Sequence, residues 1–64
     1  MVYSIFYMSI DFMAPQEVAD MLKLNVMTVY EYIRTGALKA IKFGRSYRIL
    51  MRDFERFIES RRVN

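Results

Sequence analysis

The 64-residue sequence contains no cysteine and no histidine. The absence of cysteine excludes disulfide bonds, thiolate metal ligands and thiol nucleophiles. Without histidine, no imidazole can ligate a metal or act as a general base. The few acids are scattered over predicted helix faces, and no nucleophile-base pair or metal cluster is visible. We therefore expect a protein that is not an enzyme and has no cofactor or metal.

Long apolar runs are also missing. The most apolar stretch, near the N-terminus, is interrupted by Ser4, Ser9 and Asp11, and so falls short of the ~20 residues that span a bilayer. It also lacks the basic start and the small-residue cleavage site of a secretory signal. The sequence predicts an intracellular, cytoplasmic protein with no membrane partner.

Negative charge is scarce over the second half of the chain. Residues 1–22 hold three acids and no base, whereas residues 23–64 have a net charge of +6. From Arg34 to Arg52 there are six basic residues and no acid. Such a one-sided field attracts a polyanion, and nucleic acid is the obvious candidate. On charge alone, a solvated basic face is an equal alternative.

Apolar residues are plentiful, at 55% of the chain, and aromatic residues make up 16%. This composition suits a folded domain rather than a disordered tail. A chain of this length has room for one domain with a small core, which buries roughly 60% of the surface of the unfolded chain.

Residues 2–12 alternate in the manner of a strand. One face carries the apolar side chains of Val2, Phe6, Met8, Ile10 and Phe12. A strand needs a partner, and the other strand-like residues lie beyond Leu38. The segment therefore either adds an edge to a hairpin there or pairs with another copy of itself. A third alternative is that Met8 or Met13 is the natural start and part of the segment is poorly ordered.

Two short helices are predicted next. Pro15 suits a first helical position, and a helix runs from there to about Lys23 with a stripe of inward residues. Ala14 offers no capping oxygen, which Glu17 in the first turn partly offsets. The inward residues are Val18, Ala19 and Leu22, with Met21 beside them.

The second helix covers residues 26–35, between the capping side chain of Asn25 and the stop at Gly36. Val29 and Ile33 are four residues apart and must face inward, flanked by Tyr32 and Val26. The outer face then carries groups that suit phosphate oxygens or base edges. Its members are Met27, Thr28, Tyr30, Glu31 and Arg34.

Residues 37–43 and 46–50 are predicted to be short strands around Gly44 and Arg45. Leu38, Ala40 and Ile41 are expected to supply apolar surface. A last helix is predicted from about Arg52 to Arg62. Its expected buried stripe is Phe54, Phe57 and Ile58, and the arginines after Glu59 are expected to form a solvated tail.

Four segments carry a resemblance to a known family: MAPQEVADMLKL, NVMTVYEYIRTGAL, IKFGRSYRI and DFERFI. They are similar to the family patterns L-T-x-E-E-V-A-x-L-L, S-x-x-T-V-Y-x-x-I-x-x-G-x-L, V-x-x-G-R-R-Y-R-I and D-L-x-x-F-L. From Phe12 to about Arg61 the sequence thus resembles the excisionase-like DNA-binding domains, a branch of the winged-helix proteins related to the MerR regulators.

The resemblance implies an α+β fold, a small winged helix-turn-helix with a β-hairpin wing and a C-terminal helix. Residues 1–12 would be an extra N-terminal strand and residues 13–62 the DNA-binding domain. The recognition helix, residues 26–35, would enter the major groove of double-stranded DNA. The wing, residues 43–48, would lie on the backbone or in the minor groove.

Carried over by position, the expected DNA contacts are Met27, Thr28, Tyr30, Glu31 and Arg34 on the helix and Arg45 and Arg48 on the wing. Lys42, Lys39 and Arg52 are expected to add non-specific attraction. Each contact has a structural alternative. Arg34 could only stabilise the helix dipole, Tyr30 could lie on the core, and Arg48 could pair with Glu31 or Asp53. Glu31 would either accept from a cytosine amine or orient an arginine.

The sequence also departs from the family pattern. Ala14 replaces the usual threonine cap, and Ser46 stands where a second arginine is common. Leu50 and Met51 are apolar at positions that are usually polar or basic, and would be exposed in a bare winged domain. We expect the extra strand to cover the wing side near these two residues.

The function expected from the resemblance is that of an excisionase-type protein, a recombination directionality factor of a mobile element. An integrase is a possible partner, and self-association on DNA is expected because one small domain buries little interface. The alternative is a small transcriptional regulator of a phage, plasmid or integrated element. A protein-interaction module without DNA binding is less consistent with the acid-free basic run.

Overall fold

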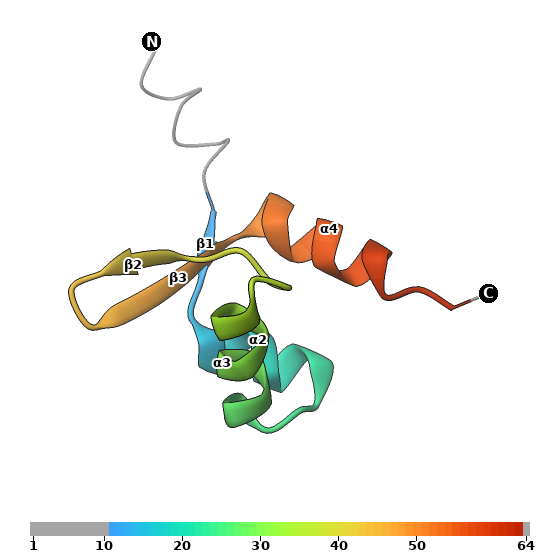
Figure 1. The fold of residues 1–64 in the computed structure, drawn as a ribbon, viewed down its shortest axis with the longest axis horizontal. Coiled ribbons are helices and arrows are strands. Elements are labelled where there is room, and N and C mark those ends of the chain that lie inside the picture. Colours follow the sequence, from blue (N-terminus) through green and yellow to red (C-terminus); the bar gives the residue numbers. More distant parts are fainter. Residues whose placement is uncertain (1–10, 64) are drawn as a thin grey trace, which may run out of the picture.

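The structure is a computed structural model that describes residues 11–63. Its elements, in chain order, are β1 (Phe12–Met13), α2 (Pro15–Leu22), α3 (Val26–Thr35), β2 (Ile41–Phe43), β3 (Ser46–Leu50) and α4 (Met51–Ser60). This is the predicted α+β winged helix-turn-helix (Figure 1). No helix within residues 11–63 has the length and apolar character needed to cross a membrane.

A three-stranded antiparallel sheet holds the domain together, in the order β1-β3-β2. Phe12 pairs with Leu50 and Met13 with Ile49, while Lys42 of β2 pairs with Tyr47. Figure 1 shows the β2-β3 hairpin projecting to one side of β1 and α4 extending to the other side, with α2 and α3 below them.

The predicted N-terminal strand falls mostly on residues 1–10, outside the described residues. Its end is described, and there it adds an edge to the hairpin, which is the first of the alternatives above. Phe12 lies beside Leu50, and the Met51 N–H donates to the carbonyl of Asp11 at 3.0 Å. Leu50 and Met51 are half-buried. The end of the strand therefore lies beside these two residues, and the rest of the predicted cover falls outside the described residues.

The first helix begins at Pro15, as predicted, and the missing cap at Ala14 is partly replaced by Glu17. The Glu17 carboxylate accepts a hydrogen bond from the Ala14 N–H at 2.7 Å. At the other end Lys23 takes the left-handed conformation, with φ 58°, and its N–H bonds to the last carbonyls of the helix. The prediction that Met21 packs inward was wrong, because its side chain is 58% exposed.

The second helix has the predicted bounds. The Asn25 side chain accepts from the Met27 N–H at 2.8 Å, and Gly36 ends the helix with φ 87°. Asn25 thus satisfies one of the N–H groups that a helix start leaves unpaired. Gly36 adopts its conformation without the cost that a side chain would impose.

The first strand of the hairpin is shorter than predicted, because it covers residues 41–43 instead of 37–43. The chain after Gly36 is held against the end of α3 instead: the Leu38 N–H donates to the Tyr32 carbonyl at 3.1 Å. Leu38 is buried, as predicted, and Ala40 packs against the core. Ile41, which was also expected to supply apolar surface, is 37% exposed and lies outside the core cluster.

The last helix begins one residue earlier and ends two residues earlier than predicted, because β3 leads into it without a loop. Its end is marked by the N–H groups of Arg61 and Arg62, which bond to carbonyls only three residues back, at 3.1 and 3.2 Å. Such bonds tighten a last turn. Phe54 and Phe57 are buried as predicted, but Ile58 is 36% exposed.

The core lies where α2, α3 and α4 meet the inner face of the sheet. It contains the side chains of Met13, Val18, Ala19, Val29, Leu38, Ile49, Phe54 and Phe57. Tyr32 of α3 packs against Phe57 of α4, with ring centroids 5.0 Å apart. This contact brings the C-terminal helix against the helix-turn-helix.

Arg61, which was predicted to belong to a solvated tail, is exposed after the end of α4 but also lies over two aromatic rings. Its guanidinium lies 4.8 Å from the centre of the Tyr32 ring and 5.1 Å from that of Phe57. An arginine over aromatic faces is attracted by the ring electrons and covers the rings with its alkyl chain. Arg62, in contrast, only approaches Glu59, at 3.3 Å, with both side chains exposed.

The cap of α3 gives a first prediction. Asn25→Ala removes the acceptor for the Met27 N–H, which should lower the free energy of unfolding by about 1 kcal/mol. For a domain of this size that corresponds to a fall of roughly 4–8 °C in Tm, measured by circular dichroism. Asn25→Ser should keep most of the stability. Equal Tm values for Asn25→Ala and the wild type would show that the cap is not needed.

The position of Arg61 gives a second prediction. Arg61→Ala should lower the free energy of unfolding by about 0.5–1 kcal/mol, because removal of the cation uncovers two aromatic faces. Arg62→Ala is the matched control, since it removes the same charge from an exposed pair, and should have a smaller effect. Chemical denaturation of both variants measures the difference. Equal losses would mean that general charge, and not stacking, determines the effect.

Candidate nucleic-acid interface

The candidate surface begins with the outer face of α3, whose orientation is fixed by burial of Val29. Val29 is completely buried, and Ile33 is half-buried on the same side. The opposite face is open: Met27 is 68% and Tyr30 39% exposed, and Glu31 and Arg34 are exposed. Thr28 is half-buried at the edge of this face. A helix that buries one stripe must present the other to solvent or to a partner.

Glu31 and Arg34 form an ion pair one turn apart on this face. Arg34 Nε donates to one carboxylate oxygen of Glu31 at 3.2 Å, and Nη2 donates to the other. This hydrogen bond holds the pKa of Glu31 below, and that of Arg34 above, its ordinary value. Both groups are therefore ionised at neutral pH. Glu31 therefore holds Arg34 in place in this structure, while the part of either residue in DNA binding stays a prediction.

The wing is the second part of the surface. Gly44 has φ 62° at the first position of the two-residue turn between β2 and β3, while Arg45 at the second has a negative φ. This pattern is that of a type II′ turn, whose twist suits a hairpin. The side chains of Lys42 and Arg45 are exposed. Within residues 11–63, neither forms a salt bridge, so both charges are available to a partner.

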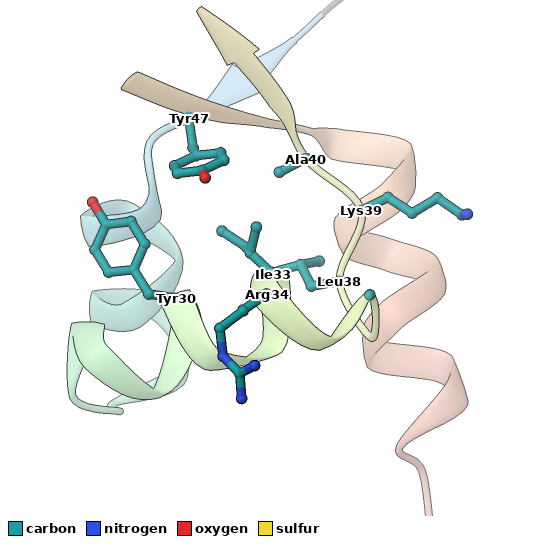
Figure 2. Close-up of a pocket in the computed structure, with 8 residues that line it drawn as sticks. Tyr30, Ile33, Arg34, Leu38, Lys39, Ala40 and Tyr47 are labelled. Atoms are coloured by element: carbon teal, nitrogen blue, oxygen red, sulfur yellow. The ribbon is translucent and has the colours of Figure 1, made fainter. Parts of the chain in front are cut away.

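A groove of about 840 Å³ lies between α3 and the chain that leads into the wing. Figure 2 shows Tyr30 and Tyr47 at one end of it and Ile33, Leu38 and Ala40 along its floor. Arg34 and Lys39 extend outward from its rim. The groove thus has an apolar floor, phenol hydroxyls at one end and cations at the border. Such a lining matches the sugars and phosphates of a nucleic-acid strand.

Contact between two tyrosines joins the helix to the wing. The rings of Tyr30 and Tyr47 are 6.1 Å apart at an angle of 63°, an edge-to-face arrangement. On the other side, the Lys42 ammonium lies 5.8 Å from the centre of the Tyr47 ring. Tyr30 therefore lies against the wing, and not flat on the core. The chain of contacts fixes Lys42 relative to the outer face of α3.

Arg48 is placed apart from the other predicted contacts. Its side chain is half-buried, and its Nη1 donates to the carbonyl of Tyr47 at 2.7 Å. Alternation along β3 directs Arg48 to the sheet face opposite Tyr47 and Ile49. The alternative partners Glu31 and Asp53 do not pair with it in the described part of the chain.

Tyr47 is a member of this surface that was not among the contacts expected from the sequence. The signal was present in the strand pattern. Tyr47 lies on the inner face but two residues nearer the turn than Ile49, where the core has ended and only α3 is left to pack against. A tyrosine suits such a boundary, since it has an apolar ring and a polar tip.

Catalytic chemistry is not apparent at this surface. Among residues 11–63 no three acidic, cysteine or histidine side chains are grouped so as to hold a metal ion. The groups present can donate hydrogen bonds and positive charge, from arginine, lysine and tyrosine. These are the groups that position a protein on DNA.

Comparison with known proteins agrees with this geometry. A sequence model of the helix-turn-helix domain matches residues 12–62, and it describes the excisionase-like family. Neither the curated proteins nor the solved structures gave a significant match. The matched range includes α2, α3, the wing and α4. A helix-turn-helix domain suggests DNA as the partner. The chain belongs to the excisionase-like family of helix-turn-helix domains.

Proposed function

We propose that this protein binds double-stranded DNA in a sequence-specific manner, with α3 in the major groove and the wing on the adjacent backbone or minor groove. The outer residues of α3 would face base edges, and Lys42 and Arg45 would contact phosphates. Arg48 is assigned a lesser role, because its guanidinium already donates to the Tyr47 carbonyl on the other face.

The observation that carries this proposal is the groove between α3 and the wing. The Tyr30-Tyr47 contact sets the two elements side by side, and Arg34 of α3 and Lys39 of the segment before β2 border the space between them. An element in the major groove and a wing beside it must straddle one DNA strand. The apolar floor of the groove would meet the sugars of that strand, and Lys39 at its rim would meet a phosphate.

The biological role we infer is that of an excisionase-type recombination directionality factor. Membership in the excisionase-like family supports it. A single module of this kind buries about 600–1,000 Å² on DNA, so several copies side by side would be needed for tight binding. Direct repeats in the target would indicate a head-to-tail arrangement, and a palindrome a two-fold dimer.

Salt dependence of binding tests the phosphate contacts. Affinity for duplex DNA should fall steeply between low and moderate salt, and Arg45→Ala should reduce the slope of log K against log [salt] by about 1. Arg56→Ala is the control, because it removes the same charge from an exposed position on α4, away from the groove. Mobility shifts at several salt concentrations supply the slopes.

Two outcomes would contradict the proposal. Absence of duplex binding at low salt would leave a protein-interaction module, and equal slopes for the Arg45 and Arg56 variants would place the wing away from DNA. The role is tested separately by excisive recombination with the integrase from the same mobile element. Stimulation of excision supports the directionality factor, whereas DNA binding that changes only transcription supports a small regulator.

A further inference from the structure

The Glu31-Arg34 pair is an acid and a base on the face that we assign to the major groove. Its charges are exposed, with 71% of the Arg34 side chain and 55% of the Glu31 side chain accessible. A carboxylate at this place repels phosphate oxygens, and it also cancels the general attraction that Arg34 would otherwise exert. The pair is therefore poorly suited to hold a DNA backbone.

The geometry of the pair favours a different role. Arg34 donates through Nε and Nη2, which together form one side of the planar guanidinium. A two-point contact of this kind fixes the plane of the group as well as its position. The end of the guanidinium, with Nη1 and the second proton of Nη2, points away from Glu31. That end presents two parallel N–H donors.

Two parallel donors on one planar group match the paired acceptors O6 and N7 of guanine in the major groove. Lysine can also donate to these two acceptors, but its ammonium is a point charge without a fixed fork, so it cannot be aimed in the same way. We propose that Arg34 reads a guanine in the target site and that Glu31 is the positioning residue that aims it. This proposal rests on the proposed function, because it requires α3 to lie in the major groove.

Selection from a pool of randomised duplexes tests the proposal, with the full chain as the binding protein. The wild type should enrich a guanine at one position. Arg34→Lys keeps the charge and should lose that preference by at least about fivefold, since a bidentate contact discriminates by roughly that much or more. Folding of each variant is checked by circular dichroism. Both side chains are exposed, so the substitutions should leave the core intact.

Variants of Glu31 separate positioning from simple repulsion. If Glu31 aims Arg34, Glu31→Ala weakens the guanine preference, and Glu31→Gln, which keeps an acceptor for Arg34, restores part of it. If Glu31 only repels phosphates, Glu31→Ala tightens binding to all duplexes and leaves the preference intact. The second result would overturn the positioning role.

A matched control exists at the C-terminal end of α4. Glu59 and Arg62 have the same spacing as Glu31 and Arg34 and a similar exposure, with Arg62 Nε 3.3 Å from the carboxylate. Glu59→Ala and Arg62→Lys should leave the selected sequence unchanged. DNA binding with a base preference that survives Arg34→Lys overturns the inference and leaves the proposed function intact. Absence of binding by the wild type overturns both.

Discussion

Burial of a small set of aliphatic side chains is the constraint on which the rest of this domain depends. Val18, Val29, Leu38 and Ile49 come from α2, α3, the segment after α3 and β3, and none is more than 1% exposed. Each burial is favourable by about 1.5–3 kcal/mol relative to an exposed side chain. In a domain with so few core residues, these contacts set the rotation of α3. Rotation of α3 in turn decides which residues face outward.

Aromatic contacts extend this constraint to the parts that a small core does not reach. Tyr32 and Phe57 join α3 to α4, and Arg61 covers both rings. Tyr30 and Tyr47 join α3 to the hairpin on the other side. The recognition helix is thus held from two directions. A helix fixed in this way can present its outer face to a partner with little loss of conformational entropy.

The polar groups of the candidate surface divide into two kinds. Lys42 and Arg45 are exposed on the wing and form no ion pair within residues 11–63, which suits attraction to a polyanion. Arg34 is already paired with Glu31 and oriented by it. In the proposed complex with DNA, the first kind would supply affinity that salt weakens, and the second would supply geometry. Non-specific attraction and site selection would then depend on different residues.

Local signals in the sequence determined the elements near their special residues. Pro15, Asn25, Gly36 and Gly44 act through backbone conformation and capping, which depend on few neighbours, so α3 and the hairpin turn were predicted at their observed positions. The helical period likewise identified Val29 as buried and the exposed residues of α3 as candidates. The family pattern was carried by the same residues.

Tertiary structure decided the features that depend on partners distant in sequence. A helical period cannot tell which edge of an apolar stripe meets another element. Met21 and Ile58 lie at such edges and are exposed, whereas Tyr32 packs against Phe57. Strand pattern alone gave no sign that Leu38 bonds back to α3, that Arg61 stacks on two rings, or that Tyr47 meets Tyr30. Each of these contacts joins elements whose relative placement is fixed only when the shared core is buried. The sequence by itself determined α3 and its outward face, and packing of the core determined what stands beside that face.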